Sequence, residues 1–286
     1  MASASRHNLG LDEKIGIIAG RGDLPLSLAS SLEKRGLSFH FLLVEGEADP
    51  NRYSGFPHDI VPIAKVGKFL KALKKSGCTA VTLAGPVSRP NFSKLIPDFE
   101  GAKLIARIGG ALSKGDDGLL SAVTNYIEEK GYHVLGAHEL EEELTISSGP
   151  LNDIIPSSDQ LGDIEKGSVI CRQIGALDIG QAIVIRKGYV LAVEAAEGTE
   201  KLLNRCEDLS WESQAGVLVK LPKPGQNLKA DMPTVGLDTL QQMKSANLSG
   251  LVIEAGNTII LDREEFLKKA NTLGLFIYAI EASGDV

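Results

Sequence analysis

The sequence predicts an α/β protein with two α/β domains, the first a Rossmann-like parallel sheet and the second a mixed sheet with helices. Its 286 residues are about twice the length of an average domain. The first half alternates short apolar runs with amphipathic segments, a rhythm typical of a parallel sheet with helices on both faces. The second half opens instead with two strand-like runs separated only by Lys187 and Gly188, which predicts a β-hairpin.

The N-terminal domain is predicted over residues 14–146, after a polar tail over residues 1–13. Short β-branched runs predict strands at Lys14–Ala19, Phe39–Val44, Ala80–Ala84 and Tyr132–Leu135. Apolar residues at helical spacing predict helices at Pro25–Arg35, at Val66–Lys75 and from Asp116 or Asp117 to Lys130. Pro25 suits the first turn of its helix, where the missing N–H has no helical partner to lose.

A Ser-, Pro- and Gly-rich stretch predicts a linker over residues 147–162, followed by a C-terminal α/β domain over residues 163–286. In that domain the hairpin strands are predicted at Ala182–Arg186 and Tyr189–Glu194. Further strands are expected at Gly216–Leu221, Gly250–Glu254, Thr258–Leu261 and Leu275–Ile280, and helices at Thr199–Cys206, Leu237–Ala246 and Arg263–Leu273. We expect a ligand cleft between the two domains, where ligands often bind.

Composition excludes several classes of protein. The formal net charge of −7 argues against a nucleic-acid partner and against electrostatic tethering to anionic lipid. No apolar run approaches the ~20 residues of a transmembrane helix, and the N-terminus has no signal-peptide core, so a cytoplasmic location is expected. The three cysteines are widely separated and predict neither a disulfide framework nor a zinc site. Nothing in the sequence predicts an oligomeric state.

A glycine-containing loop, Gly20-Arg21-Gly22-Asp23, lies between the first predicted strand and helix. Glycines there allow a ligand to approach the backbone, and the N-terminus of the helix attracts anions. Gly20, Gly22 and Asp23 are therefore candidate substrate-binding residues. The loop also resembles the dinucleotide fingerprint, but Pro25 replaces its third glycine. Three interpretations remain open: a phosphate or nucleotide site, an NAD-dependent oxidoreductase, and a tight structural turn.

Three segments of the second half carry polar residues in loop-like contexts: GALDIGQ, EAAEGT and VKLPKPGQNLKADMPTVG. The third combines Lys220, Lys223 and Lys229 with the acid Asp231. Cations beside a single acid suit a phosphate-bearing ligand, whose charge must be neutralised before chemistry.

Together with KIGIIAGRGDLP, LSKGDDGLLSAV and VIEAGNTIILDRE, these segments closely resemble the LpxI family of UDP-2,3-diacylglucosamine pyrophosphatases, from about Lys14 to Ile280. The resemblance implies Mg²⁺-dependent hydrolysis of UDP-2,3-diacylglucosamine, by attack of water at the α-phosphorus, to UMP and 2,3-diacylglucosamine 1-phosphate (lipid X). This is a step of lipid A biosynthesis. The acyl chains of such a glycolipid nucleotide imply transient contact with a membrane surface, peripheral to the inner membrane. The alternatives are the oxidoreductase and a non-catalytic nucleotide-sugar or lipid-binding protein.

The resemblance places the catalytic aspartate in DMPTVG, at Asp231, as a metal ligand or as a general base toward water. Mg²⁺ binds hard oxygen ligands, so other acids near the motifs are candidate metal ligands: Glu194, Glu197, Asp116 and Asp117. Gln181, Thr199, Lys220 and Lys223 are candidate substrate-binding residues. The five histidines show no HxxxH or HExxH spacing, which excludes a transition-metal mechanism on such motifs. Neither a GxSxG elbow nor a GxxxxGK[ST] loop occurs.

Overall fold

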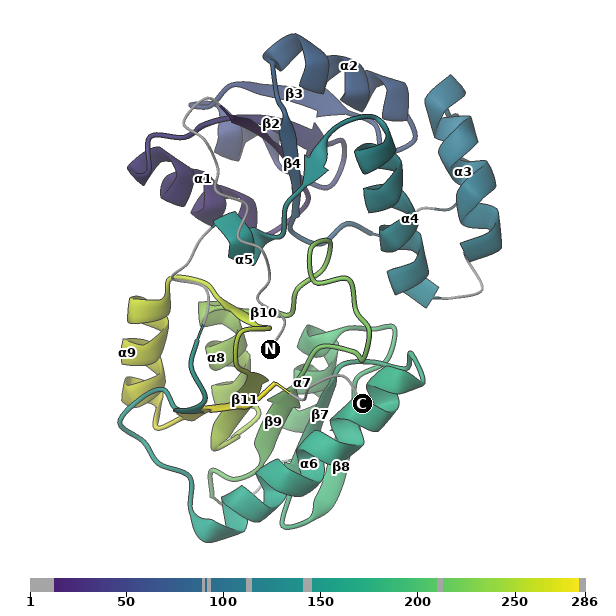
Figure 1. Cartoon of the computed structure of the whole chain (residues 1–286). Coiled ribbons are helices and arrows are strands. Elements are labelled where there is room, and N and C mark those ends of the chain that lie inside the picture. Colours follow the sequence, from purple (N-terminus) through teal and green to yellow (C-terminus); the bar gives the residue numbers. More distant parts are fainter. Residues whose placement is uncertain are drawn as a thin grey trace. The chain divides into compact units, whose positions relative to one another are not determined.

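The computed structural model describes residues 13–88, 91, 94–111, 115–140, 146–209 and 213–282. The chain divides into two compact units (Figure 1). Unit 1 comprises residues 1–142 and the short segment 227–231, and unit 2 comprises residues 143–226 and 232–286. Both units have the predicted α/β architecture, so the fold class is confirmed. The expected ligand cleft stays a prediction.

Unit 1 is built on a parallel sheet, sheet A, with strand order β3-β2-β1-β4-β5. Its strands are β1 (Lys14–Ala19), β2 (Ser38–Val44), β3 (His58–Val61), β4 (Ala80–Ala84) and β5 (His133–Val134). Its helices are α1 (Leu24–Lys34), the 3₁₀ turn η1 (Pro50–Tyr53), α2 (Val66–Ser76), α3 (Phe99–Ala111), α4 (Gly115–Glu129) and α5 (Ala137–Leu140). Strand order changes direction between β1 and β4, the position where α/β sheets commonly bind ligands.

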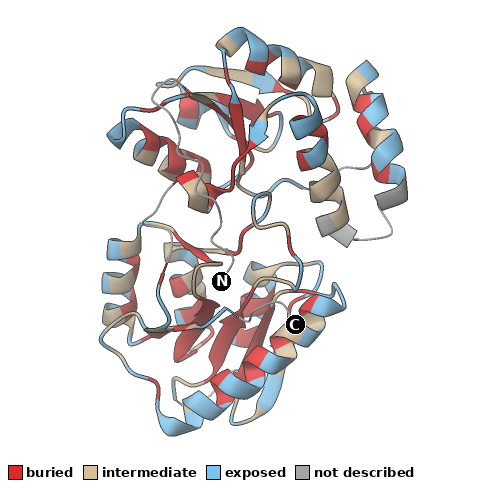
Figure 2. Cartoon of the chain, viewed as in Figure 1, coloured by how far each residue is buried: buried red, intermediate tan, exposed pale blue. Residues whose placement is uncertain are grey.

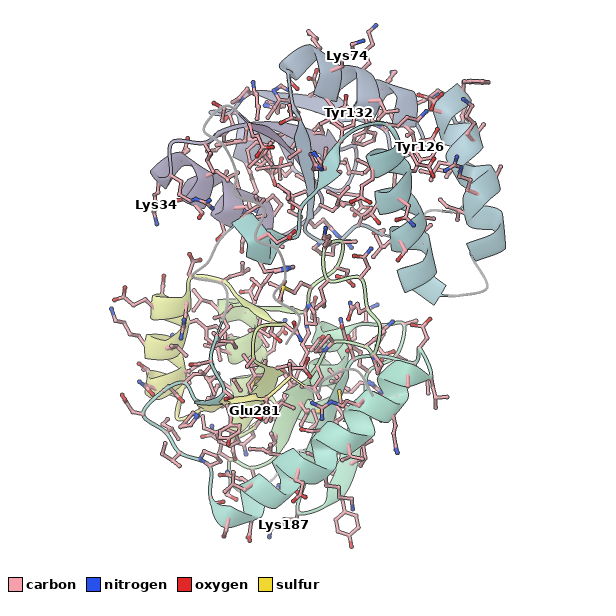
Figure 3. The ribbon with its side chains drawn as sticks, in the orientation of Figure 1. Lys34, Lys74, Tyr126, Tyr132, Lys187 and Glu281 are labelled. Atoms are coloured by element: carbon pink, nitrogen blue, oxygen red, sulfur yellow. The ribbon has the colours of Figure 1, made fainter. Side chains whose placement is uncertain are left out.

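Alternate residues of the strands in sheet A face opposite helical layers. Leu42, Val81 and Val134 pack with Leu73 of α2 and Ile127 of α4 on one face. The α3 helix packs outside this layer against α4, where Tyr126 points toward α3 and its hydroxyl donates to Glu100 (Figure 3). Burial is concentrated in the strands (Figure 2), as expected for a sheet covered on both faces.

Unit 2 contains a mixed sheet, sheet B, with strand order β6-β13-β11-β9-β7-β8. Its strands are β6 (Gly149–Pro150), β7 (Ala182–Arg186), β8 (Tyr189–Val193), β9 (Val217–Lys220), β11 (Gly250–Glu254) and β13 (Phe276–Ile280). The β7 strand is antiparallel to both β8 and β9, whereas β9, β11 and β13 are parallel. A separate parallel pair joins β10 (Thr234–Val235) to β12 (Ile259–Ile260).

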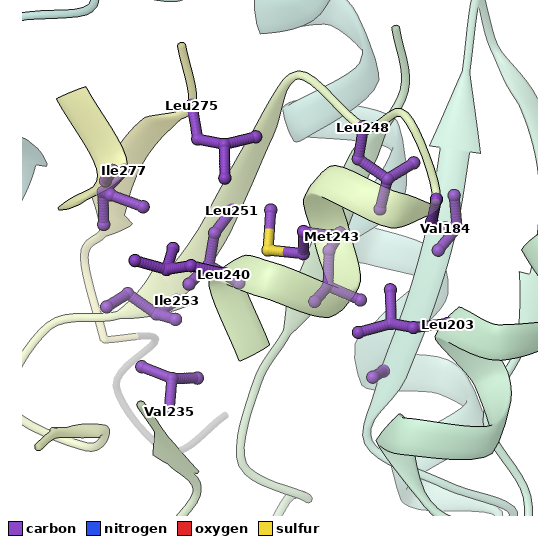
Figure 4. Packing of buried hydrophobic residues seen from close by; sticks show 14 of the residues in the cluster. Val184, Leu203, Val235, Leu240, Met243, Leu248, Leu251, Ile253, Leu275 and Ile277 are labelled. Carbon is purple, nitrogen blue, oxygen red and sulfur yellow. The ribbon is translucent and has the colours of Figure 1, made fainter. Parts of the chain in front are cut away.

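The helices of unit 2 cover both faces of sheet B. One face packs on α7 (Thr199–Glu207), α8 (Leu237–Ser245) and α9 (Arg263–Leu273), and Figure 4 shows part of this core around Met243. The opposite face packs on α6 (Ser158–Ala176) through Ile164 and Cys171. Residues 147–162, the predicted linker, include β6 and the first residues of α6.

Sequence patterns did not predict the 19-residue helix α6 because glycines interrupt it. One of them, Gly167, is required for packing: a Cβ atom there would lie 2.9 Å from Val219 and 3.0 Å from Ile185. The glycine therefore allows close approach between helix and sheet, rather than ending the helix. Ser157 and Gln160 form a capping box at its N-terminus.

Candidate active site

One end of sheet B collects polar residues from three neighbouring strands. The β9 strand ends at Lys220, which pairs with Ala182 at the start of the antiparallel β7. The β8 strand leads into Glu194, whose N–H donates to the carbonyl of Ala182 at 2.8 Å. Antiparallel pairing therefore brings Gln181, Glu194 and Lys220 to the same edge, although they are distant in sequence.

A chain of hydrogen bonds connects these residues through Thr199, the first residue of α7. The Thr199 hydroxyl donates to Glu194 Oε1 at 3.0 Å and accepts from Lys220 Nζ at 3.1 Å. Lys220 Nζ also donates to the carbonyl of Thr234, and the Gln181 N–H donates to Glu194 Oε2 at 3.3 Å. Glu194 is 6% exposed and Lys220 is 9% exposed, so their opposite charges compensate one another in a largely buried site.

Two further features of this site are the close packing of Gly180 and a buried side-chain oxygen on Gln181. Gly180 permits the approach of Glu194, because a Cβ atom on Gly180 would lie 2.1 Å from the Glu194 carbonyl oxygen. The side-chain oxygen of Gln181 is buried, and it has no hydrogen-bond partner among the described residues. A buried acceptor without a donor is uncommon, and a ligand hydroxyl or amide would satisfy it.

Two further ion pairs lie in the same part of unit 2. Lys223 Nζ contacts Asp178, which follows α6 with a positive φ of 54°. Arg172 of α6 donates to Glu254 Oε2 at 3.2 Å, and Asn257 donates to Glu254 Oε1 at 2.8 Å. Glu254 ends β11, the parallel neighbour of β9, so it lies at the same sheet edge as Lys220.

Cys171 lies among these charges and is not a reactive thiol. Burial raises its pKa to about 12, and the carboxylates of Glu194 and Glu254 contribute in the same direction. Its Sγ donates to the Gln181 carbonyl at 3.2 Å. Cysteine chemistry is therefore not expected at this site.

Asp231 lies on the segment Asn227–Asp231, which belongs to unit 1 although it is flanked in sequence by residues of unit 2. The Asp231 side chain is exposed, and its N–H donates to the carbonyl of Asn227 at 3.0 Å. The side-chain nitrogen of Asn227 in turn donates to Thr124 of α4 at 3.2 Å. Packing therefore assigns the predicted catalytic aspartate to the unit formed mainly by the first half of the chain.

The glycine loop of unit 1 lies at the β1/β4 switch point of sheet A. Gly20 donates to the Ala84 carbonyl at 2.8 Å, and a Cβ atom on Gly20 would lie 2.5 Å from the Pro86 carbonyl oxygen. This close packing accounts for a glycine at position 20 even if no ligand binds there. Gly22, by contrast, is exposed with φ of +83°. Arg52, which the sequence did not indicate, donates to the Gly22 carbonyl and pairs with Asp23.

Family models identify both parts of the chain. The model of the LpxI N-terminal domain matches residues 14–144, and that of the LpxI C-terminal domain matches residues 147–278. The chain belongs to the LpxI family. It is also 42% identical over 274 residues to a protein of Caulobacter vibrioides (strain ATCC 19089 / CIP 103742 / CB 15) named "UDP-2,3-diacylglucosamine pyrophosphatase LpxI". The alignment covers 94% of this chain and 98% of that relative, so the resemblance seen in the sequence is confirmed.

In this LpxI-family chain, the candidate metal ligands differ in the partners they have. Both oxygens of Glu194 accept hydrogen bonds from within unit 2, and one oxygen of Glu197 is paired with Arg205 at 2.6 Å. Asp116 and Asp117 lie in the first turn of α4, but their side chains lie outside the described part of the structure. The described residues contain no group of three His, Cys, Asp or Glu side chains placed to hold a metal ion.

The structure brings the separately predicted residues Gln181, Glu194, Thr199 and Lys220 into one hydrogen-bonded cluster, and Arg172 and Glu254, which were not predicted, lie in the same part of unit 2. The sequence does mark Glu254 as a candidate, because this acid ends a predicted strand within the VIEAGNTIILDRE motif. It does not mark Arg172, since the helix that carries it was not predicted. The described part of the chain contains no helix long and apolar enough to cross a membrane.

Proposed function

We propose that this chain hydrolyses the diphosphate of UDP-2,3-diacylglucosamine to UMP and 2,3-diacylglucosamine 1-phosphate, a step of lipid A biosynthesis. The observation that carries the proposal is the 42% identity to the named Caulobacter pyrophosphatase over nearly the full length of both chains. Both family models match this chain in the expected order, and the alignment covers 98% of that relative.

The cluster in unit 2 suits the binding of phosphate. Lys220 brings an ammonium group and Thr199 a hydroxyl to one point at the edge of sheet B. Lys223 and Arg172 add cations that are paired with Asp178 and Glu254. Phosphate oxygens would replace these carboxylates as partners of the cations, and the arginine offers the bidentate geometry that phosphate groups favour. We therefore infer that this edge of unit 2 binds a phosphate of the substrate.

Asp231 provides an exposed carboxylate for the reacting water. An exposed aspartate is accessible both to a substrate and to the hydrated metal that accompanies a diphosphate. Its oxygens would hold Mg²⁺ or accept a proton from the attacking water. When bound, Mg²⁺ would neutralise phosphate charge and polarise phosphorus. The donor set fits this ion, because a single carboxylate together with phosphate and water is a common Mg²⁺ environment.

The substrate also suggests where the protein works. Two acyl chains make UDP-2,3-diacylglucosamine amphipathic, and such a molecule partitions into a lipid layer. We propose that this chain meets its substrate by transient contact with the cytoplasmic surface of the inner membrane.

Release of UMP from UDP-2,3-diacylglucosamine in the presence of Mg²⁺ tests the function directly. We expect UMP and lipid X in equal amounts, with multiple turnovers per protein. Tight binding of the same compound without turnover would support a non-catalytic carrier instead. Binding of NAD(H), detected by the fluorescence of the cofactor, would support the oxidoreductase interpretation and contradict the proposal.

A further inference from the structure

Asn227 makes a set of contacts that the proposed reaction does not use directly. Its side-chain oxygen accepts from the Lys229 N–H at 3.2 Å. Its side-chain nitrogen donates to Thr124 Oγ1 at 3.2 Å and reaches Ser121 Oγ at 3.5 Å. Its carbonyl accepts from the N–H groups of Ala230 at 2.9 Å and Asp231 at 3.0 Å. One residue thus binds α4 on one side and the backbone of Asp231 on the other.

The directions of these hydrogen bonds are mutually consistent. The Lys229 N–H can only donate, so it fixes the Asn227 oxygen on its side and turns the amide nitrogen toward α4. The Thr124 hydroxyl donates its own proton to the Ser121 carbonyl at 3.0 Å, which leaves a lone pair for Asn227. Thr124 is buried, so the bond between Thr124 and Asn227 is shielded from competing water.

A second contact holds the same segment. Gly136, just after β5, lies so close to it that a Cβ atom on Gly136 would be 3.2 Å from Lys229 Cα. The segment Asn227–Asp231 is therefore packed on unit 1 at both α4 and the residues after β5. An exposed catalytic side chain needs such a fixed backbone, because small errors of position lower the rate strongly.

We propose that Asn227 is a positioning residue for the reaction, which fixes the backbone of Asp231 by binding Thr124 of α4. This inference rests on the proposed function, because it assigns a purpose to Asn227 only if Asp231 acts in hydrolysis. The replacement Asn227→Asp keeps an oxygen for Lys229 and removes the N–H donor to Thr124, but it also adds a negative charge, so it is tested together with neutral changes at Thr124. From the other side, Thr124→Val removes the acceptor and Thr124→Ser retains it.

The test measures kcat and KM for UDP-2,3-diacylglucosamine with Mg²⁺ in each variant, with folding followed by circular dichroism. Asn227→Asp and Thr124→Val should each lower kcat about 10-fold and leave KM within about twofold. Thr124→Ser should retain the normal kcat. The double variant should be no slower than the slower single variant, since both changes break one hydrogen bond. A surface control is Thr272→Val, which makes the same change at an exposed threonine on α9 whose hydroxyl also bonds a carbonyl of its own helix.

The outcomes separate this inference from the proposed function. Normal kcat in Asn227→Asp and Thr124→Val, with an inactive Asp231→Ala variant, would overturn the positioning role alone. Additive losses in the double variant, or an equal loss in Thr124→Ser, would overturn it as well, because they indicate general damage to α4. Normal turnover by Asp231→Ala would overturn both assignments.

Discussion

The ammonium group of Lys220 and the carboxylate of Glu194 are joined through a single hydroxyl group, that of Thr199. The hydroxyl donates to the carboxylate at 3.0 Å while it accepts from the ammonium at 3.1 Å. Replacing it therefore alters the surroundings of both charges.

The change Thr199→Val should raise KM for UDP-2,3-diacylglucosamine by about 10-fold and destabilise unit 2. The valine removes one donor from the buried Glu194, a loss that costs about 1–3 kcal/mol. Thr199→Ser, which keeps the hydroxyl, is the matched control and should show normal KM and Tm. If Thr199→Val bound substrate normally, this cluster would not be the phosphate site.

Asp231→Ala should lower kcat by at least ~10²-fold, the range reached by general-base catalysis. Because Asp231 is exposed, Tm should remain unchanged. Substrate binding should persist, since the phosphate site proposed in unit 2 does not include Asp231. Steady-state kinetics and direct binding measure the two effects separately, and near-normal turnover would remove Asp231 from the mechanism.

Chelation by EDTA should abolish UMP release, and added Mg²⁺ should restore it. The proposed donor is a single exposed carboxylate with substrate phosphate and water, so the ion should exchange readily. Activity is measured after dialysis against EDTA, then after stepwise addition of Mg²⁺. Full activity in the chelated protein would rule out the metal-dependent mechanism.

Two glycines of the first loop should respond differently to substitution. Gly20→Ala places a Cβ atom 2.5 Å from the Pro86 carbonyl oxygen, so it should lower Tm. A Cβ atom on Gly22 would lie 4.0 Å from Pro86 Cδ, an ordinary contact, and Gly22 has a φ of +83°, so Gly22→Val should add backbone strain of about 1–3 kcal/mol. If the loop binds substrate, Gly22→Val should also raise KM in protein that remains folded by circular dichroism. An unchanged KM would mean that Gly22 forms the turn but does not bind substrate.

Hydrolysis in H₂¹⁸O should place the label in UMP and leave lipid X unlabelled. Attack at the α-phosphorus forms the new P–O bond on the uridine side, whereas attack at the β-phosphorus forms it on the lipid side. Both routes expel a phosphate monoester, so the position of the water decides between them. Mass spectrometry of the two products shows which of them carries the label. Labelled lipid X would mean that water attacks the β-phosphorus, although the overall hydrolysis would be the same.

Strong local patterns predicted much of the fold, because short β-branched runs indicate strands and amphipathic segments indicate helices without information from distant residues. The first strand has the predicted bounds, Lys14–Ala19, and the helix at Arg263–Leu273 does as well. The α6 helix escaped prediction because its glycines serve tertiary packing, as Gly167 does against Val219 and Ile185. Local helix propensity does not account for a glycine that is required by packing between a helix and a sheet.

The candidate site was predictable as a set of residues but not as an arrangement. Antiparallel pairing of β7 with β8 and β9 brings Glu194 and Lys220 to the same end of sheet B, and Thr199 joins them from the start of α7. The pair formed by Arg172 and Glu254 depends on α6 and β11 at once. Sequence motifs indicated the residue types, whereas sheet register determines which side chains form hydrogen bonds and ion pairs.

The assignment of residues 227–231 to unit 1 has a consequence for dividing the polypeptide. A cut between residues 144 and 147, where one family model ends and the other begins, would leave Thr124 on one fragment and Asn227 on the other. The N-terminal fragment would lose a segment that it packs against. The C-terminal fragment would carry Asp231 on a segment that has lost its contacts with unit 1. Genetic exchange between relatives would face the same constraint, because a hybrid must inherit α4 and the Asn227–Asp231 segment together. Recombination at the border between the two family models would therefore separate residues 227–231 from the unit on which they pack.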